Sequence, residues 1–136
     1  MLKRLLLTCA LLLTSFVAVA GQDTLLPLAV RTATNTGADQ YRTIETGIHL
    51  IVNVTVAPGS DTVTPKIQGK DNLGNYYDLL VGPAISTTGT TVLKIGKGIV
   101  GVANASAADI VPDVYRVVVT HSASSSFTYS VTITRN

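Results

Sequence analysis

Residues 71–75 read DNLGN, and their types come closest to a site for chemistry in this chain. Asp71, Asn72 and Asn75 offer side-chain oxygens, but calcium takes about six to eight oxygen ligands and no acidic residue follows at EF-hand spacing. A phosphate loop would need several glycines leading into a helix. The residues after Asn75 read instead as a strand. We therefore interpret DNLGN as a hairpin bend, where Asp, Asn and Gly tolerate left-handed backbone angles.

Other reactive residue types give no stronger indication of catalysis. His49 and His121 could share a zinc ion, but a third ligand is not evident. Serine is abundant, yet the Gly-x-Ser-x-Gly nucleophile motif is absent. Asp109 and Asp113 could form a carboxylate pair, although their spacing around a proline suits turn capping better. The sequence therefore predicts a non-enzymatic protein with no catalytic residue, no cofactor and no metal.

Alternation of apolar and polar residues is the dominant pattern of the chain. It is clearest in Gly47–Ala57, Phe127–Thr134 and Val114–His121. Successive side chains of a strand point to opposite faces, so each segment predicts a strand with one buried face. The predicted buried positions are Ile48, Leu50, Val52, Val54, Val117, Val119, Tyr129, Val131 and Ile133.

Four further segments read as strands: Asp23–Thr34, Thr62–Lys70, Tyr76–Val81 and Thr90–Gly96. Pro65 lacks an N–H, so its strand is expected at a sheet edge or to carry a bulge. In Tyr76–Val81, the side chains of Tyr77, Leu79 and Val81 are expected on one face. With seven or eight strands and no convincing helical periodicity, the chain is predicted to be all-β. The expected fold is an antiparallel β-sandwich, either Ig-like or jelly-roll-like.

The first 20 residues differ in character from the rest. Lys3 and Arg4 precede an apolar run, and Ala18-Val19-Ala20 is a small-x-small pattern that signal peptidase accepts. We interpret residues 1–20 as a signal-peptide-like or membrane-anchoring leader, and residues 21–136 as a single domain. Cys9 is the only cysteine, so residues 21–136 cannot form a disulfide among themselves.

Charge argues against nucleic acid as a partner. Residues 21–136 hold eight basic and eight acidic residues, because two of the ten basic residues lie in the leader. A balanced charge gives no basic footprint for a phosphate backbone. Membrane association is expected only through an uncleaved leader, and no small-molecule substrate is predicted.

The segment 96–113 is long and rich in small residues, as functional loops often are. Its apolar residues Ile99, Val100 and Val102 have no obvious strand register, which is typical of an interface patch. The alternative is that they tuck over one end of the sandwich. Tyr76, on the outward face of its strand, is a fourth candidate for contact with a partner.

Several stretches together resemble a group of small virion proteins of tailed bacteriophages. They are TLLPLAVRTAT (24–34), GIHLIVNVT (47–55), KIQGKDNLGNYYDLL (66–80), AISTTGT (84–90), DIVPDVYRVVVTH (109–121) and TYSV (128–131). The resemblance implies a β-sandwich on the virion, as a head-decoration or other accessory structural protein. It supplies no site residues.

Two functions follow as expectations. The first is a phage virion accessory protein that decorates the capsid by contact with other virion proteins or with itself; a trimer at a threefold position would match the symmetry of the particle. The second is an exported bacterial β-sandwich of the surface or adhesion type, located in the periplasm, at the cell surface or in the medium. The leader favours the second, because a virion component that assembles in the cytoplasm needs no export.

Overall fold

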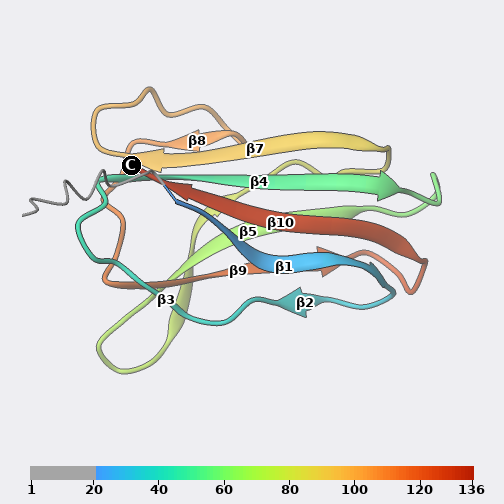
Figure 1. The fold of residues 1–136 in the computed structure, drawn as a ribbon, viewed down its shortest axis with the longest axis horizontal. Coiled ribbons are helices and arrows are strands. Elements are labelled where there is room, and N and C mark those ends of the chain that lie inside the picture. Colours follow the sequence, from blue (N-terminus) through green and yellow to red (C-terminus); the bar gives the residue numbers. More distant parts are fainter. Residues whose placement is uncertain (1–20) are drawn as a thin grey trace, which may run out of the picture.

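A computed structural model describes residues 21–136 and shows an all-β domain built from two mostly antiparallel sheets (Figure 1). The predicted leader, with Cys9, lies outside the described residues. Within residues 21–136, no helix is long and apolar enough to cross a membrane.

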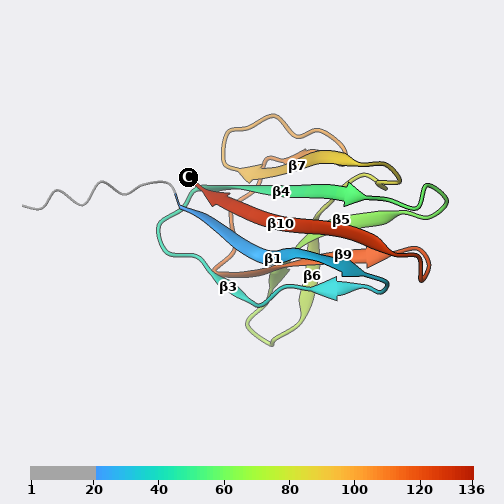
Figure 2. The same ribbon diagram turned by 45° about the vertical axis from the view of Figure 1, so that its right-hand side comes forward.

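Sheet A contains five strands. In spatial order they are β1 (Gln22–Arg31), β10 (Phe127–Arg135), β4 (Gly47–Val56), β7 (Gly89–Gly96) and β8 (Ser106–Ala107). All neighbours are antiparallel except β7 and β8, which are parallel. Figure 2 shows the four long strands of sheet A lying side by side in front of β9 and β5.

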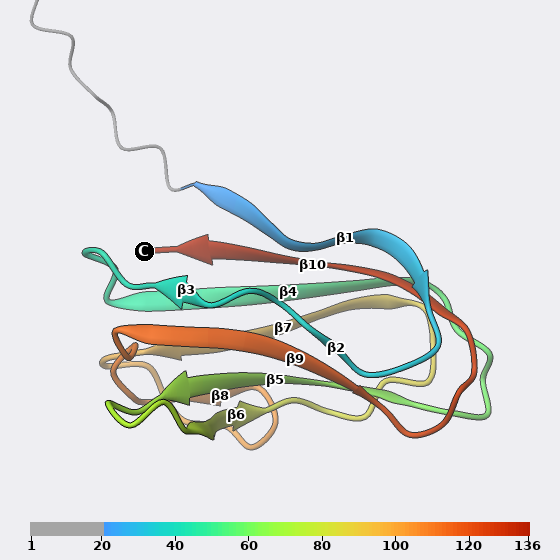
Figure 3. The same cartoon turned by 90° about the horizontal axis from the view of Figure 1, so that it is seen from below.

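Sheet B forms the second layer. Its spatial order is β2 (Asn35–Thr36), β9 (Val114–His121), β5 (Val63–Lys70) and β6 (Tyr76–Val81), and β3 (Gln40–Tyr41) also pairs with β9. Figure 3 shows β9, β5 and β6 neighbouring one another, with β2 and β3 along the β9 side.

Residues 21–136 form ten strands rather than the seven or eight predicted. The seven longer strands correspond to the seven predicted segments. The three additional strands have two residues each, too few to show alternation in the sequence.

The predicted core is confirmed. All nine positions named for β4, β9 and β10 are buried, with at most 1% of each residue exposed. They join Phe127, Ile67 and Leu93 in one apolar cluster to which both sheets contribute. The strands form because one face of each buries β-branched and aromatic side chains, the main source of stability in a domain without disulfides.

Of the two alternatives predicted for the Pro65 strand, the sheet edge is wrong, because β5 has β9 on one side and β6 on the other. The pairing of β5 with β6 does carry a bulge, but it falls between Ile67 and Gln68 rather than at Pro65. Regular pairing with β6 begins at Lys66, and the Gly82 N–H donates to the Pro65 carbonyl oxygen at 2.8 Å. The N and O atoms of a strand residue point to the same side. The missing N–H of Pro65 therefore faces the point where the β5–β6 ladder gives way to a loop.

The predicted face of β6 is also wrong in part. Ile67 pairs with Leu80 but the next residue, Gln68, pairs with Asp78, so β6 carries an extra residue at this point. This bulge turns Leu80 into the core, where only 8% of it is exposed, and leaves Leu79 at the margin.

A polar cluster around Arg135 links the two sheets at the end of β10. Its guanidinium pairs with Asp23 of β1, donates to Gln40 Oε1 of β3 at 2.8 Å and donates to the Tyr115 hydroxyl of β9 at 3.1 Å. Its Nε also lies 3.7 Å from Glu45 Oε1. One side chain thus contacts four separate segments.

Glu45 is buried, with 4% of the residue exposed, yet its carboxylate is well satisfied. Burial by itself would raise its pKa. Its own N–H, the N–H and hydroxyl of Thr43 and the N–H of Ile44 outweigh this and bring the pKa below the ordinary value. Glu45 is therefore an anion held inside the fold close to Arg135 and the Tyr115 hydroxyl.

Val52→Ala tests the register of β4. We expect a loss of about 1–3 kcal/mol in the free energy of unfolding, because buried methyl groups are removed and a cavity remains. Ser130→Ala, on the opposite face of the neighbouring strand, should change it by less than about 0.5 kcal/mol. Urea denaturation of both variants measures this, and equal losses would contradict the register.

Glu45→Gln tests the buried anion through pH. A carboxyl whose pKa is lowered on folding contributes stability that is complete above its unfolded pKa of about 4.3 and is lost as pH falls through the lower folded value. We expect the variant to be less stable by roughly 1–3 kcal/mol at pH 7. The difference between the two proteins in urea denaturation should shrink as pH falls from about 5 towards 3; a constant difference would exclude an ionised Glu45.

Candidate functional site

The outer face of sheet A is almost without charge. We call its outward-pointing residues the threonine face: Gln22, Thr24, Val30, His49, Ile51, Asn53, Thr55, Val56, Thr90, Val92, Lys94, Thr128, Ser130, Thr132 and Thr134. With neutral histidine, Lys94 is the only formal charge among them. The central row across the four strands is Thr24, Thr132, Ile51 and Val92. These short side chains form a continuous uncharged surface.

The outer face of sheet B is the opposite in character. Asp78 accepts from Lys66 and Gln68 at 2.9 and 2.7 Å, and Arg116 Nε donates to Gln68 Oε1 at 2.9 Å. The pKa of Asp78 is lowered by its hydrogen bond from Gln68 and then by Lys66. We call these residues, with Asp39, Lys70 and Tyr76, the ionic face.

Tyr76 belongs to the ionic face. Its hydroxyl donates to Asp39 Oδ1 at 2.6 Å, and the Arg116 guanidinium carbon lies 3.3 Å from the centre of its ring. The hydrogen bond from Tyr76, followed by that from Lys70, lowers the pKa of Asp39. Tyr76 faces outward as expected, and its ring and hydroxyl are engaged within the chain. It lies on sheet B, whereas the other predicted contact residues lie in the segment between β7 and β8.

The other three predicted contact residues lie beyond β7. Val100 and Val102 are 81% and 53% exposed, whereas Ile99 is partly buried. The segment closes on itself through Val102 N–H to Ser106 O at 2.9 Å and Ser106 Oγ to Val100 O at 2.7 Å. The two exposed valines lie in the segment between β7 and β8, and β8 pairs with β7 at the edge of sheet A (Figure 1).

The two histidines do not meet. His49 points outward from β4, whereas His121 on β9 packs edge-on against Phe127 at a ring-centroid distance of 5.6 Å. Burial, followed by the charge of Arg31, lowers the pKa of His121. Across the described range, no three His, Cys, Asp or Glu residues are grouped to hold a metal.

The DNLGN stretch is a hairpin turn, as predicted. Asp71 Oδ1 accepts the N–H groups of Leu73 and Asn75 at 2.8 Å each, and Oδ2 accepts from the Asn75 amide at 3.0 Å. Gly74 has φ +91°, a left-handed angle suited to glycine. The Asp71 carboxylate therefore orders the turn.

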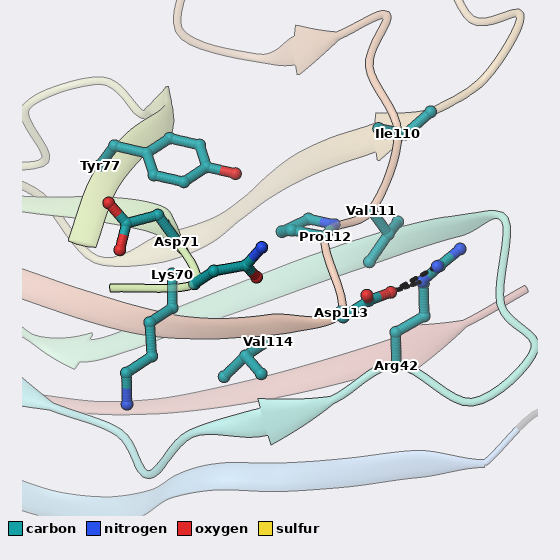
Figure 4. A pocket seen from close by; sticks show the side chains of 10 residues that line it. Arg42, Lys70, Asp71, Tyr77, Ile110, Val111, Pro112, Asp113 and Val114 are labelled. Atoms are coloured by element: carbon teal, nitrogen blue, oxygen red, sulfur yellow. Dashed lines mark hydrogen bonds and ion pairs between the residues drawn. The ribbon is translucent and has the colours of Figure 1, made fainter. Parts of the chain in front are cut away.

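A hollow of about 420 Å³ lies beside this turn, at the end of the sandwich (Figure 4). The 110–114 segment forms one wall, Tyr77 and the turn form another, and Arg42 closes the rim. In Figure 4 the Tyr77 hydroxyl points toward Pro112, and the Lys70 side chain runs away from the ring. Arg42 Nε donates to Asp113 Oδ1 at 3.2 Å across the rim.

Sequence reasoning missed both the threonine face as a surface and the hollow. The alternation in β4 and β10 was a usable signal for the first, because it also identifies the outward residues. The hollow joins segments distant in sequence, so no local pattern indicates it. No protein-family model and no curated protein matches this chain.

Proposed function

We propose that this protein is a non-enzymatic structural protein that acts by protein–protein contact through the threonine face. The observation that carries the proposal is the single formal charge among the outward residues of four neighbouring strands. Well-solvated protein surfaces carry charge on about 25–35% of their residues. The buried centres of interfaces, in contrast, are depleted of charge.

Covering the threonine face with a partner would cost little free energy. Thr, Val and Ile have few rotamers, so immobilising them costs less side-chain entropy than immobilising Lys or Glu. Covering this face would desolvate one ammonium group, whereas covering the ionic face would desolvate several charges. The even charge balance gives little long-range steering, so recognition depends on shape and on hydroxyl hydrogen bonds.

Within this class we favour an accessory protein of a bacteriophage particle, in line with the resemblance in sequence. Its partners would be other virion proteins or further copies of itself, and a trimer at a threefold position would match a symmetric particle. An Ig-like or jelly-roll-like sandwich suits such a role. In this proposal the protein binds no nucleic acid, and any membrane contact runs through an uncleaved leader.

The second candidate is an exported surface or adhesion domain. The composition of residues 1–20 favours it, with a basic start, an apolar run and a small-x-small end. The same threonine face would then contact a partner outside the cytoplasm. The two candidates differ in where the protein is found and whether residues 1–20 remain attached.

A matched pair of charge insertions tests the proposal. Thr132 and Thr120 are half-buried outward threonines in interior strands of sheets A and B. Because an unpaired ammonium in an interface centre is costly, Thr132→Lys should lower the amount of protein on gradient-purified particles about tenfold or more. Thr120→Lys, on the ionic side, should leave that amount unchanged. Quantitative mass spectrometry of the particles gives both values.

Equal retention of both variants would exclude the threonine face as the contact surface. If wild-type protein is absent from particles and is found outside the cytoplasm without residues 1–20, the exported alternative is correct.

A further inference from the structure

The hollow contains an aromatic platform that depends on a glycine. A Cβ atom placed on Gly69 would lie 2.6 Å from Tyr77 Cζ and 2.7 Å from its hydroxyl oxygen, so the ring lies directly on the glycine backbone. Pro112 Cγ lies 3.1 Å from the same position. Tyr77 nevertheless remains 46% exposed. One part of the Tyr77 ring therefore packs on Gly69, and the exposed part of the ring can contact a ligand.

The charged groups around this platform are already compensated. Arg42 pairs with Asp113, and the Lys70 ammonium reaches Asp39 at 2.9 Å. Asp71 is held by the donors of its own turn, and its hydrogen bond from the Asn75 side chain lowers its pKa. The hollow therefore offers no uncompensated charge for a phosphate, a carboxylate or a metal ion.

Several polar side chains of the hollow can still form hydrogen bonds with a ligand. Within residues 21–136, neither the side-chain amide of Asn72 nor the hydroxyl of Tyr77 forms a hydrogen bond with another residue. Only one oxygen of Asp113 is engaged by Arg42, and 84% of the Asp113 side chain is exposed. The side-chain amide of Asn72 can donate to and accept from hydroxyl groups, and the Asp113 carboxylate can accept from them.

We propose that the hollow binds a neutral carbohydrate. A sugar ring presents an apolar C–H face, which fits the Tyr77 ring and Pro112, and a rim of hydroxyls, which fits Asn72, Asp113 and Arg42. The volume of about 420 Å³ falls within the range of small-ligand sites and is sufficient for a monosaccharide or disaccharide. The site lies at the end of the sandwich, away from the threonine face, so it is a second function beyond the proposed contact role.

The direct test is a titration of the ¹⁵N-labelled full chain with neutral disaccharides: maltose, cellobiose, lactose, mannobiose and N,N′-diacetylchitobiose. At least one should shift the backbone amide signals of Asn72, Tyr77 and Asp113 in a saturable way. Tyr77→Ala should weaken that binding about tenfold, because it removes the stacking surface. Asn72→Ala, at an exposed turn position, should weaken it with little effect on folding.

Tyr41→Ala is the matched control, since Tyr41 is 69% exposed but does not line the hollow. It should bind the same sugar within about twofold of wild type. The proposal is overturned if none of the five sugars shifts these amides, if Tyr77→Ala binds as wild type does, or if inorganic phosphate gives the same shifts with equal affinity. Thr132→Lys should retain sugar binding, which separates failure of this site from failure of the contact role.

Discussion

The register of β10 is the constraint on which the rest of the structure depends. β10 lies between β1 and β4, and a slip of one residue would exchange its buried and outward faces. Arg135 pins the end of this strand by its simultaneous contacts with Asp23, Gln40 and Tyr115, and by its proximity to Glu45. These contacts reach both sheets. The polar cluster at the end of the sandwich is therefore compatible with one register of β10, the register in which its apolar residues face the core.

The two sheets present unlike surfaces. On sheet A the register of β10 places threonine, serine and valine outward, so that covering this face requires little desolvation of charge. On sheet B the pairing of β5 with β6 and β9 brings Lys66, Asp78 and Arg116 into one hydrogen-bonded network that favours solvent. In the proposed role, the threonine face is presented to a partner and the ionic face to water.

Alternation was sufficient to predict the core of β4, β9 and β10, because a strand with one wet face shows its period directly in the sequence. Alternation failed where strand pairing determines the position of a residue. Pro65 lies in a central strand, and a bulge moves Leu80 into the core. Alternation placed Tyr76 outward, but it could not indicate that the Tyr76 hydroxyl bonds Asp39 from a distant segment. The hollow joins Arg42, Tyr77 and Asp113 from three segments, so its formation depends on tertiary structure that no local pattern encodes.

In the proposed role, the threonine face is covered when the protein is assembled with its partner. Hydroxyl-radical footprinting, read by mass spectrometry, reports the solvent exposure of individual side chains and can compare isolated protein with purified particles. The account predicts that His49, Ile51 and Val92 become protected on assembly, while Tyr76, Lys66 and Arg116 keep the labelling of the isolated protein. Unchanged labelling of the first three, with protection of the second three, would contradict it.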